Sequence, residues 1–230
     1  IVGVESLIRW HHPDLGLIGP DEFIAVAEET GSIIDIGAWV IKQACHACQV
    51  LSAQQQTPIQ VAINISPRQF RDPNLVATMR RSLLDAELDP QNIEIEITET
   101  MLMQDINAAQ NTINQLSKLG VRLAIDDFGT GYSSLNYLKR FPINTVKIDR
   151  SFVVDLPSNA DDMAITRAVI AMAHQLKMEV VAEGVETKEQ LAFLKQHQCE
   201  YAQGWLFSQA LPLKQMLSLL AHDLKTVHLK

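Results

Sequence analysis

Short runs rich in valine and isoleucine alternate with longer stretches of helical periodicity, and this alternation constrains the fold more than any other feature of the sequence. Buried parallel strands are short and aliphatic, and each requires a crossover before the next strand. Strands are expected at residues 1–6, 60–66, 92–97, 121–126, 144–149, 178–183 and 200–206. Helices are expected at residues 20–31, 36–51, 73–86, 106–119, 165–176, 187–197 and 213–222.

Repetition of strand and helix without a change in composition predicts one parallel α/β domain over residues 1–230. The number of strands favours a (β/α)₈, TIM-barrel-like fold whose first strand lies upstream of Ile1. A doubly wound sheet is the competing arrangement. Because the chain opens directly on a strand pattern, we expect an N-terminally incomplete domain that belongs to a longer multidomain protein.

Composition excludes several classes of protein. A net charge of −8 over 230 residues argues against a nucleic-acid-binding surface, so no DNA binding is expected. The sequence lacks an apolar run of about 20 residues, so we expect no direct membrane insertion by this segment. Three cysteines, an odd number, suit a reducing compartment and predict a cytoplasmic domain, although the full-length protein could be anchored to a membrane.

Polar residues follow the aliphatic part of nearly every predicted strand. In a barrel the functional side chains lie at the C-terminal ends of the strands, and side chains alternate between the two faces of each strand. This alternation places the polar residues on the inner face and the flanking aliphatic residues toward the helices. The inner-face positions are Glu5, Asn64, Glu96, Asp126, Lys147, Asp149, Glu183 and Gln203.

Charge balance then indicates the chemistry of this set. One acid at a strand end is more often a helix cap or a structural ion pair than a functional group. Several carboxylates cannot share a small cleft without compensating charge, and Lys147 is the obvious base among them. Oxygen ligands of this kind suit Mg²⁺ or Mn²⁺. Adjacent Asp126 and Asp127 could serve two ions, as in two-metal phosphoryl transfer.

The motifs in this order resemble one family. They are ESLIRW at residues 5–10, residues 20–28, NIS at 64–66, EITE at 96–99, DDFGTGYSSL at 126–135, KID at 147–149, AEGVE at 182–186 and QG at 203–204. The chain resembles the EAL domain, a bacterial cyclic-di-GMP phosphodiesterase, from its first residue to about Pro212. The resemblance implies a modified EAL barrel that hydrolyses cyclic di-GMP to linear pGpG and so lowers this second messenger in bacterial signalling.

The resemblance also implies roles for individual residues. A first metal ion would be bound by Glu5, Asn64, Glu96 and Asp126. A second ion would be bound by the bridging Asp126 together with Asp127 and Glu183. The residues implied in the chemistry are Glu183, which activates the water, with Lys147 and Asp127 beside it. Those implied in substrate binding are Arg9, Asp149 and Gln203, while Glu99 would support the loop at residues 127–135.

The resemblance further implies two bound ions of Mg²⁺ or Mn²⁺ and a homodimer. It also implies an upstream sensor or GGDEF-type domain in the same chain. The alternative function is a catalytically silent domain that binds cyclic di-GMP as a sensor or scaffold. All the implied metal positions are intact, which favours the enzyme. The chain departs from the family pattern at Ser6, in place of alanine, and at Gln209 and Ala210, in place of a basic residue and proline.

Four other features have simpler explanations. Cys45 and Cys48 lie on a predicted helix without a second pair, so we interpret them as structural rather than zinc ligands. His11 and His12 are expected in an extended loop. The glycines at 129 and 131 lack the lysine of a phosphate-binding loop and favour a lid. Glu94 is expected in a polar layer below Glu96.

Overall fold

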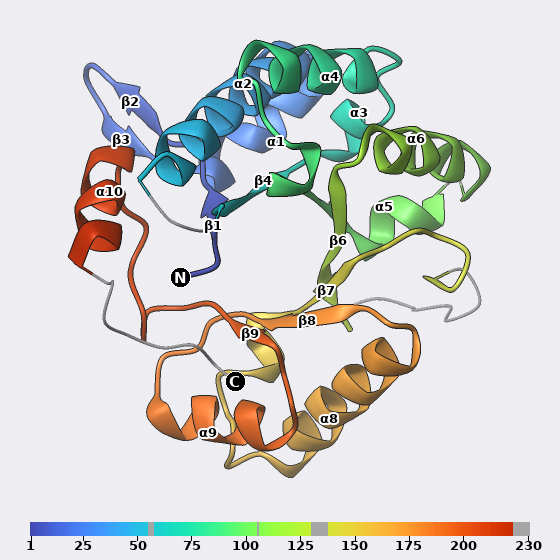
Figure 1. Ribbon diagram of the computed structural model, residues 1–230, viewed down its shortest axis with the longest axis vertical. Coiled ribbons are helices and arrows are strands. Elements are labelled where there is room, and N and C mark those ends of the chain that lie inside the picture. Colours follow the sequence, from blue (N-terminus) through green and yellow to red (C-terminus); the bar gives the residue numbers. More distant parts are fainter. Residues whose placement is uncertain (55–57, 105, 130–137, 223–230) are drawn as a thin grey trace. The chain divides into compact units, whose positions relative to one another are not determined.

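The computed structural model describes residues 1–54, 58–104, 106–129 and 138–222 (Figure 1). Two compact units make up the chain. The first comprises Ile1–Glu96 and Asp105–Val121, and the second comprises Ile97–Gln104 and Arg122–Lys230.

Parallel strands form the centre of the first unit. Strand β1 (Gly3–Ser6) pairs with β4 (Gln60–Asn64), which pairs with β5 (Ile93–Thr98), a strand that belongs to this unit as far as Glu96. Ile63 and Ile95 are register partners with no exposed surface. A separate antiparallel hairpin joins β2 (Trp10–His12) to β3 (Gly16–Ile18).

Helices cover the strands of the first unit. They are α1 (Pro20–Thr30), α2 (Ile33–Ser52), α3 (Pro67–Phe70), α4 (Leu75–Asp85), the 3₁₀ helix η1 (Pro90–Asn92) and α6 (Ile106–Leu119). Helix α2 packs on β4 and lies beside α4 (Figure 1). Local sequence sets the helix starts: Pro20 opens α1, and Ser66 and Gln69 form a capping box around the first turn of α3.

The second unit is a parallel sheet with helices. Its strands β6 (Arg122–Phe128), β7 (Thr145–Ile148), β8 (Glu179–Ala182) and β9 (Tyr201–Ala202) pair in that order. Its helices are α5 (Glu99–Gln104), the 3₁₀ helix η2 (Arg150–Phe152), α8 (Ala160–Gln175), α9 (Lys188–Gln196) and α10 (Leu213–His222). Helices α8 and α9 lie on the same side of β7 and β8 (Figure 1).

A polar network joins the first residues of β6, β7, β8 and β9. Arg122 forms an ion pair with Glu179 and donates from Nη2 to Thr145 Oγ1 at 3.2 Å. The Tyr201 hydroxyl donates to Glu179 Oε1 at 3.3 Å. Burial, followed by the neighbouring Glu179 carboxylate, raises the pKa of Tyr201. The network therefore stabilises the N-terminal edge of this sheet.

The structure confirms the alternation of strand and helix and corrects it at several elements. His11 and His12 belong to strand β2, so the expectation of a loop was wrong. The strand expected at residues 200–206 pairs only at Tyr201–Ala202, because the chain turns immediately after Gln203. The short helices α3 and α5 were not anticipated. None of the described helices is long and apolar enough to cross a bilayer.

Candidate active site

In the first unit the predicted polar residues share one face of the sheet. The strand register pairs Glu5 with Ala62, and Asn64 with Glu96, and partners in parallel strands lie on the same face. Asn64 Nδ2 donates to Glu5 Oε1 at 2.6 Å. Glu96 is 2% exposed, and Glu94 is buried two residues before it, as expected of a polar layer.

In the second unit Lys147 lies between two carboxylates. Its Nζ is 2.6 Å from Glu183 Oε1 and 3.4 Å from Asp126 Oδ1. The lysine side chain is 2% exposed, while those of Asp126 and Glu183 are 14% and 19% exposed. A buried ammonium of this kind is stable only beside negative charge, so the three side chains hold one another in place.

Asp127 has an unusual backbone for a residue with a side chain. Its φ is 54°, in the left-handed region that aspartate tolerates better than most residues. The pairing of β6 with β7 shifts register between Ile125 and Phe128, so the two aspartates lie in a β-bulge. The Asp127 amide donates to Asp126 Oδ1 at 3.1 Å. Bulges and left-handed residues often occur where a side chain must be redirected at a functional site.

The remaining predicted residues lie in surroundings of different kinds. Asp149 caps η2, and its Oδ1 accepts a hydrogen bond from the Ser151 backbone amide at 3.0 Å. Gln203 follows β9, and its backbone amide donates to Ala182 O at 2.8 Å. Arg9 is exposed and donates to Ile8 O at 2.7 Å. Glu99 opens α5 and is 3% exposed, and neither of its oxygens has a hydrogen-bond partner among the described residues. Residues 130–135 of the loop assigned to it, including the lid glycine 131, lie outside the described residues.

The donor chemistry of both units suits hard divalent cations. Asn64 commits its amide nitrogen to Glu5, which leaves its Oδ1 as the atom suited to a cation. In the second unit one ammonium faces Asp126 and Glu183, and Asp127 adds a third carboxyl group. Within the described residues no three His, Cys, Asp or Glu side chains surround a common point. The fit therefore rests on donor type and charge balance, because carboxylate and amide oxygens are the ligands that Mg²⁺ and Mn²⁺ prefer.

The cysteines are buried thiols. All three are free, and Cys48 donates to Ile59 O at 3.4 Å. Burial raises the pKa of Cys45 and of Cys199 to about 12, with smaller contributions from Cys48 and Glu200 respectively. Thiols that hold their protons so firmly are poor metal ligands, which agrees with the structural role expected for Cys45 and Cys48.

The sequence indicated no role for Arg150, Glu186 or Trp205, which form a cluster around the segment that follows Glu183. Arg150 Nη2 is 2.8 Å from Glu186 Oε1, and the guanidinium lies 5.7 Å from the centre of the Trp205 ring. The one hint in the sequence was the glycine at position 184. In the structure its missing side chain leaves room for Arg150.

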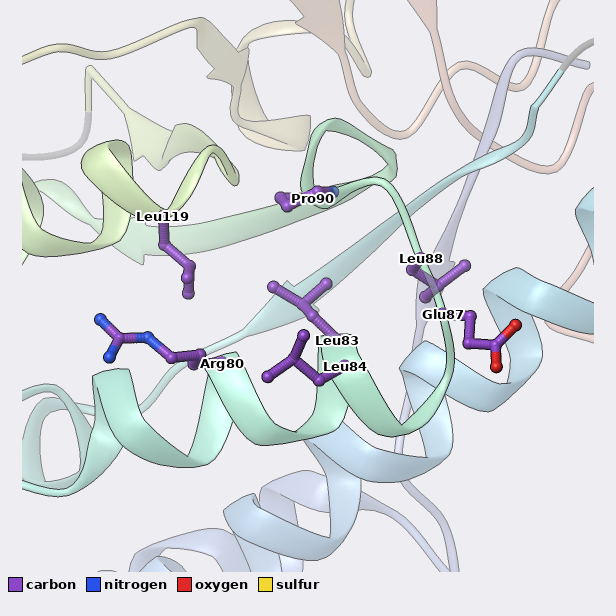
Figure 2. Close-up of a pocket in the computed structure, with 7 residues that line it drawn as sticks. All are labelled: Arg80, Leu83, Leu84, Glu87, Leu88, Pro90 and Leu119. Carbon is purple, nitrogen blue, oxygen red and sulfur yellow. The ribbon is translucent and has the colours of Figure 1, made fainter.

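The first unit contains a small apolar pocket that is lined by other residues than those described above. It has a volume of about 340 Å³ and is lined by Arg80, Leu83, Leu84, Glu87, Leu88, Pro90 and Leu119. Figure 2 shows Leu83 and Leu84 between Arg80 at one end and Glu87 at the other. None of the predicted site residues lines this pocket.

Comparison with curated proteins finds close relatives in bacterial signalling. The chain is 46% identical over 210 residues to the cyclic di-GMP phosphodiesterase NbdA of Pseudomonas aeruginosa, covering 91% of this chain and 27% of that protein. It is 42% identical over 221 residues to MucR of the same organism, a bifunctional diguanylate cyclase/cyclic di-GMP phosphodiesterase, covering 96% of this chain and 32% of MucR. The chain thus spans about a quarter to a third of the length of these relatives.

Solved structures agree with the fold class. The structure of the PaMucR phosphodiesterase in complex with c-di-GMP matches with a TM-score of 0.90 at 42% identity, covering 94% of this chain and 87% of that one. This match confirms the expected α/β, barrel-like class. The family model described as the EAL domain matches residues 1–210. The chain belongs to the EAL domain family.

Proposed function

We propose that this chain is a metal-dependent phosphodiesterase that hydrolyses cyclic di-GMP to linear pGpG. The Glu183–Lys147–Asp126 arrangement carries the proposal, because it presents a carboxylate held by a buried ammonium at the C-terminal ends of parallel strands. This is the end of α/β sheets at which catalytic groups are found. The names of NbdA and MucR, which state the same activity for those proteins, support it.

The proposal assigns two ions of Mg²⁺ or Mn²⁺ to the carboxylates and the amide. The ligands would be Glu5, Asn64, Glu96 and Asp126 for one ion, and Asp126, Asp127 and Glu183 for the other. Divalent cations bound in this way supply positive charge that stabilises the phosphoryl-transfer transition state and makes water a better nucleophile. The donor set supports the assignment, since it combines excess negative charge with oxygen ligands.

Protein groups would supply the proton transfer and the orientation. Glu183 would accept the proton of the attacking water as general base. Lys147 would hold the Glu183 carboxylate through its 2.6 Å contact and add positive charge beside the reacting phosphate. Arg9, Asp149 and Gln203 would contact the substrate, and Asp149 also caps η2. Glu99 would support the loop at residues 127–135.

The same proposal includes the partners of the chain and the cell compartment in which it works. A homodimer and an upstream sensor or GGDEF-type domain are expected, and MucR, which combines cyclase and phosphodiesterase functions, supports the second expectation. A cytoplasmic setting agrees with the three free, buried cysteines.

The test is a turnover assay on the full chain with cyclic di-GMP, in which Mg²⁺ or Mn²⁺ is titrated from zero and the products are separated chromatographically. We expect pGpG, formed at a rate that saturates with metal. Glu183→Gln keeps the shape of the side chain but removes the base, so kcat is expected to fall about 10²- to 10⁴-fold. Glu189→Gln, an exposed acid in the first turn of α9, is the matched control and keeps the wild-type rate.

Two results would overturn parts of the proposal. Tight binding of cyclic di-GMP without product, at saturating metal, would make the chain a sensor or scaffold instead of an enzyme. Full activity of Glu183→Gln would remove Glu183 from the chemistry while leaving the substrate unchanged.

A further inference from the structure

Trp205 is a large aromatic side chain that is 62% exposed in the turn directly after β9. A cation faces its ring: the Arg150 guanidinium lies 5.7 Å from the ring centre. A guanidinium over an indole is attracted by the ring's electrons and favours one ring orientation. Trp205 is thus exposed and also in contact with a cation, which distinguishes it from an apolar residue that is exposed by chance.

Two features hold Arg150 in place. Its Nη2 is 2.8 Å from Glu186 Oε1. Gly184 lies against its stem with φ of 67°, and a Cβ built on Gly184 would come within 2.3 Å of Arg150 Cγ. Residue 184 therefore has to be glycine for the arginine to lie in this position.

The turn that carries Trp205 is fastened to the segment that follows Glu183. The Val185 amide donates to Gln203 O at 2.9 Å, and the Leu206 amide donates to Val185 O at 3.0 Å. Gly204 permits this approach, because a Cβ there would lie 2.2 Å from Val185 O. Trp205 and Glu183 are therefore positioned by one hydrogen-bonded assembly of two loops at the C-terminal edge of the second unit's sheet.

We propose that Trp205 is a stacking surface for a guanine base of the substrate, an inference that rests on the proposed function. A cyclic dinucleotide presents two flat purines beside its phosphates, and Trp205 offers one of them an exposed indole on a loop that is hydrogen-bonded to the segment following Glu183. Stacking on an aromatic side chain binds a base without requiring positive charge, which suits a protein of net charge −8. Arg150 and Glu186 act as positioning residues for the ring.

Steady-state kinetics of three variants of the full chain test this proposal. Trp205→Ala is expected to raise the KM for cyclic di-GMP about tenfold and to leave kcat within about twofold, because stacking contributes to binding rather than to proton transfer. Trp205→Phe keeps an aromatic surface and is expected to recover most of the affinity. Trp39→Ala, on α2 in the first unit, removes a tryptophan of similar exposure, 55%, and is expected to keep the wild-type KM.

Fluorescence provides a readout that does not depend on turnover. Cyclic di-GMP is expected to quench tryptophan emission of the wild-type chain, and Trp205→Phe is expected to abolish most of that change while still binding the nucleotide by calorimetry. If the wild type does not hydrolyse cyclic di-GMP, the proposed function fails, and this quenching still decides whether a base stacks on Trp205. Equal quenching in Trp205→Phe and wild type would overturn the inference.

One further result would also overturn it: a KM unchanged in Trp205→Ala with hydrolysis intact. A shift of the same variant in size-exclusion chromatography would then identify the ring as a protein contact. Should Trp205→Ala fail to fold by circular dichroism, the phenylalanine variant and the quenching measurement decide the question.

Discussion

At the scale of single residues, Asp127 combines a predicted catalytic role with a strained backbone. Its φ of 54° costs less for glycine than for alanine, because only glycine lacks the Cβ that crowds the left-handed region. We expect Asp127→Gly to be more stable than Asp127→Ala by about 1 kcal/mol, which is a few degrees in Tm for a chain of this length. Both variants are expected to lose hydrolysis. Thermal unfolding and the turnover assay measure the two effects.

Asp161 provides the matched control, because it lies in the first turn of α8 with helical neighbours. There the order is expected to reverse, with Asp161→Ala more stable than Asp161→Gly, since glycine is the poorer helix former. Equal stability of the two Asp127 variants would show that the left-handed conformation carries no cost at this position.

Sequence could predict which polar residues end the strands and which of them share a face, but not how they contact one another. The alternation of side chains along each strand placed Asn64 and Glu96 on one face, and the register confirms it. The two contacts of Lys147 depend on distances between strands, which no local pattern encodes. Trp205 was missed for a similar reason: an isolated aromatic residue in a turn has no signal until Arg150 is placed against it.

At the scale of elements, the strands of the second unit carry different groups of polar residues at their two ends. The C-terminal ends carry Asp126, Lys147 and Glu183, and the N-terminal ends carry the Arg122–Glu179 network. Glu179→Ala leaves Arg122 and the Tyr201 hydroxyl without this acceptor. Because both charged side chains are partly exposed, at 26% and 41%, the expected loss in the free energy of unfolding is only about 1 kcal/mol. The KM for cyclic di-GMP is expected to stay at its wild-type value.

Urea unfolding and steady-state kinetics check this division. Asp85→Ala is the control, since its ion pair with Arg81 joins side chains that are 83% and 60% exposed, and its removal is expected to change stability little. A raised KM in Glu179→Ala would show that the N-terminal network also positions the candidate active site.

The elements that sequence missed are those too short for a periodic pattern. Strands β2 and β3 have three residues each, so neither shows the alternation that identifies a longer strand. Helix α3 has four residues, and only its capping box marks it. Long helices such as α2 and α6 were predictable because their apolar stripes extend over several turns.

At the scale of the whole molecule, buried thiols in both units predict how stability depends on pH. Burial raises the pKa of Cys45 and of Cys199 from 9.0 to about 12. Below pH 9 the thiols are protonated in the folded and the unfolded chain alike. As the pH rises from 9 toward 12, the unfolded chain loses these protons while the folded chain keeps them, so the unfolded state gains stability. The free energy of unfolding is therefore expected to fall by on the order of 1 kcal/mol per pH unit for each thiol.

Urea unfolding between pH 8.5 and 10.5, with a reductant present, measures this slope. The double variant Cys45→Ala, Cys199→Ala removes both thiols and is expected to show a shallower decline over the same range. The pKa of Tyr201 is also raised, and this residue is present in both proteins. Its contribution to the slope is therefore the same in both and does not affect the comparison. Identical slopes would mean that the unfolded chain shields its thiols as well as the folded chain does. A shallower slope in the double variant would show that these core cysteines tie the stability of the fold to proton binding in this range.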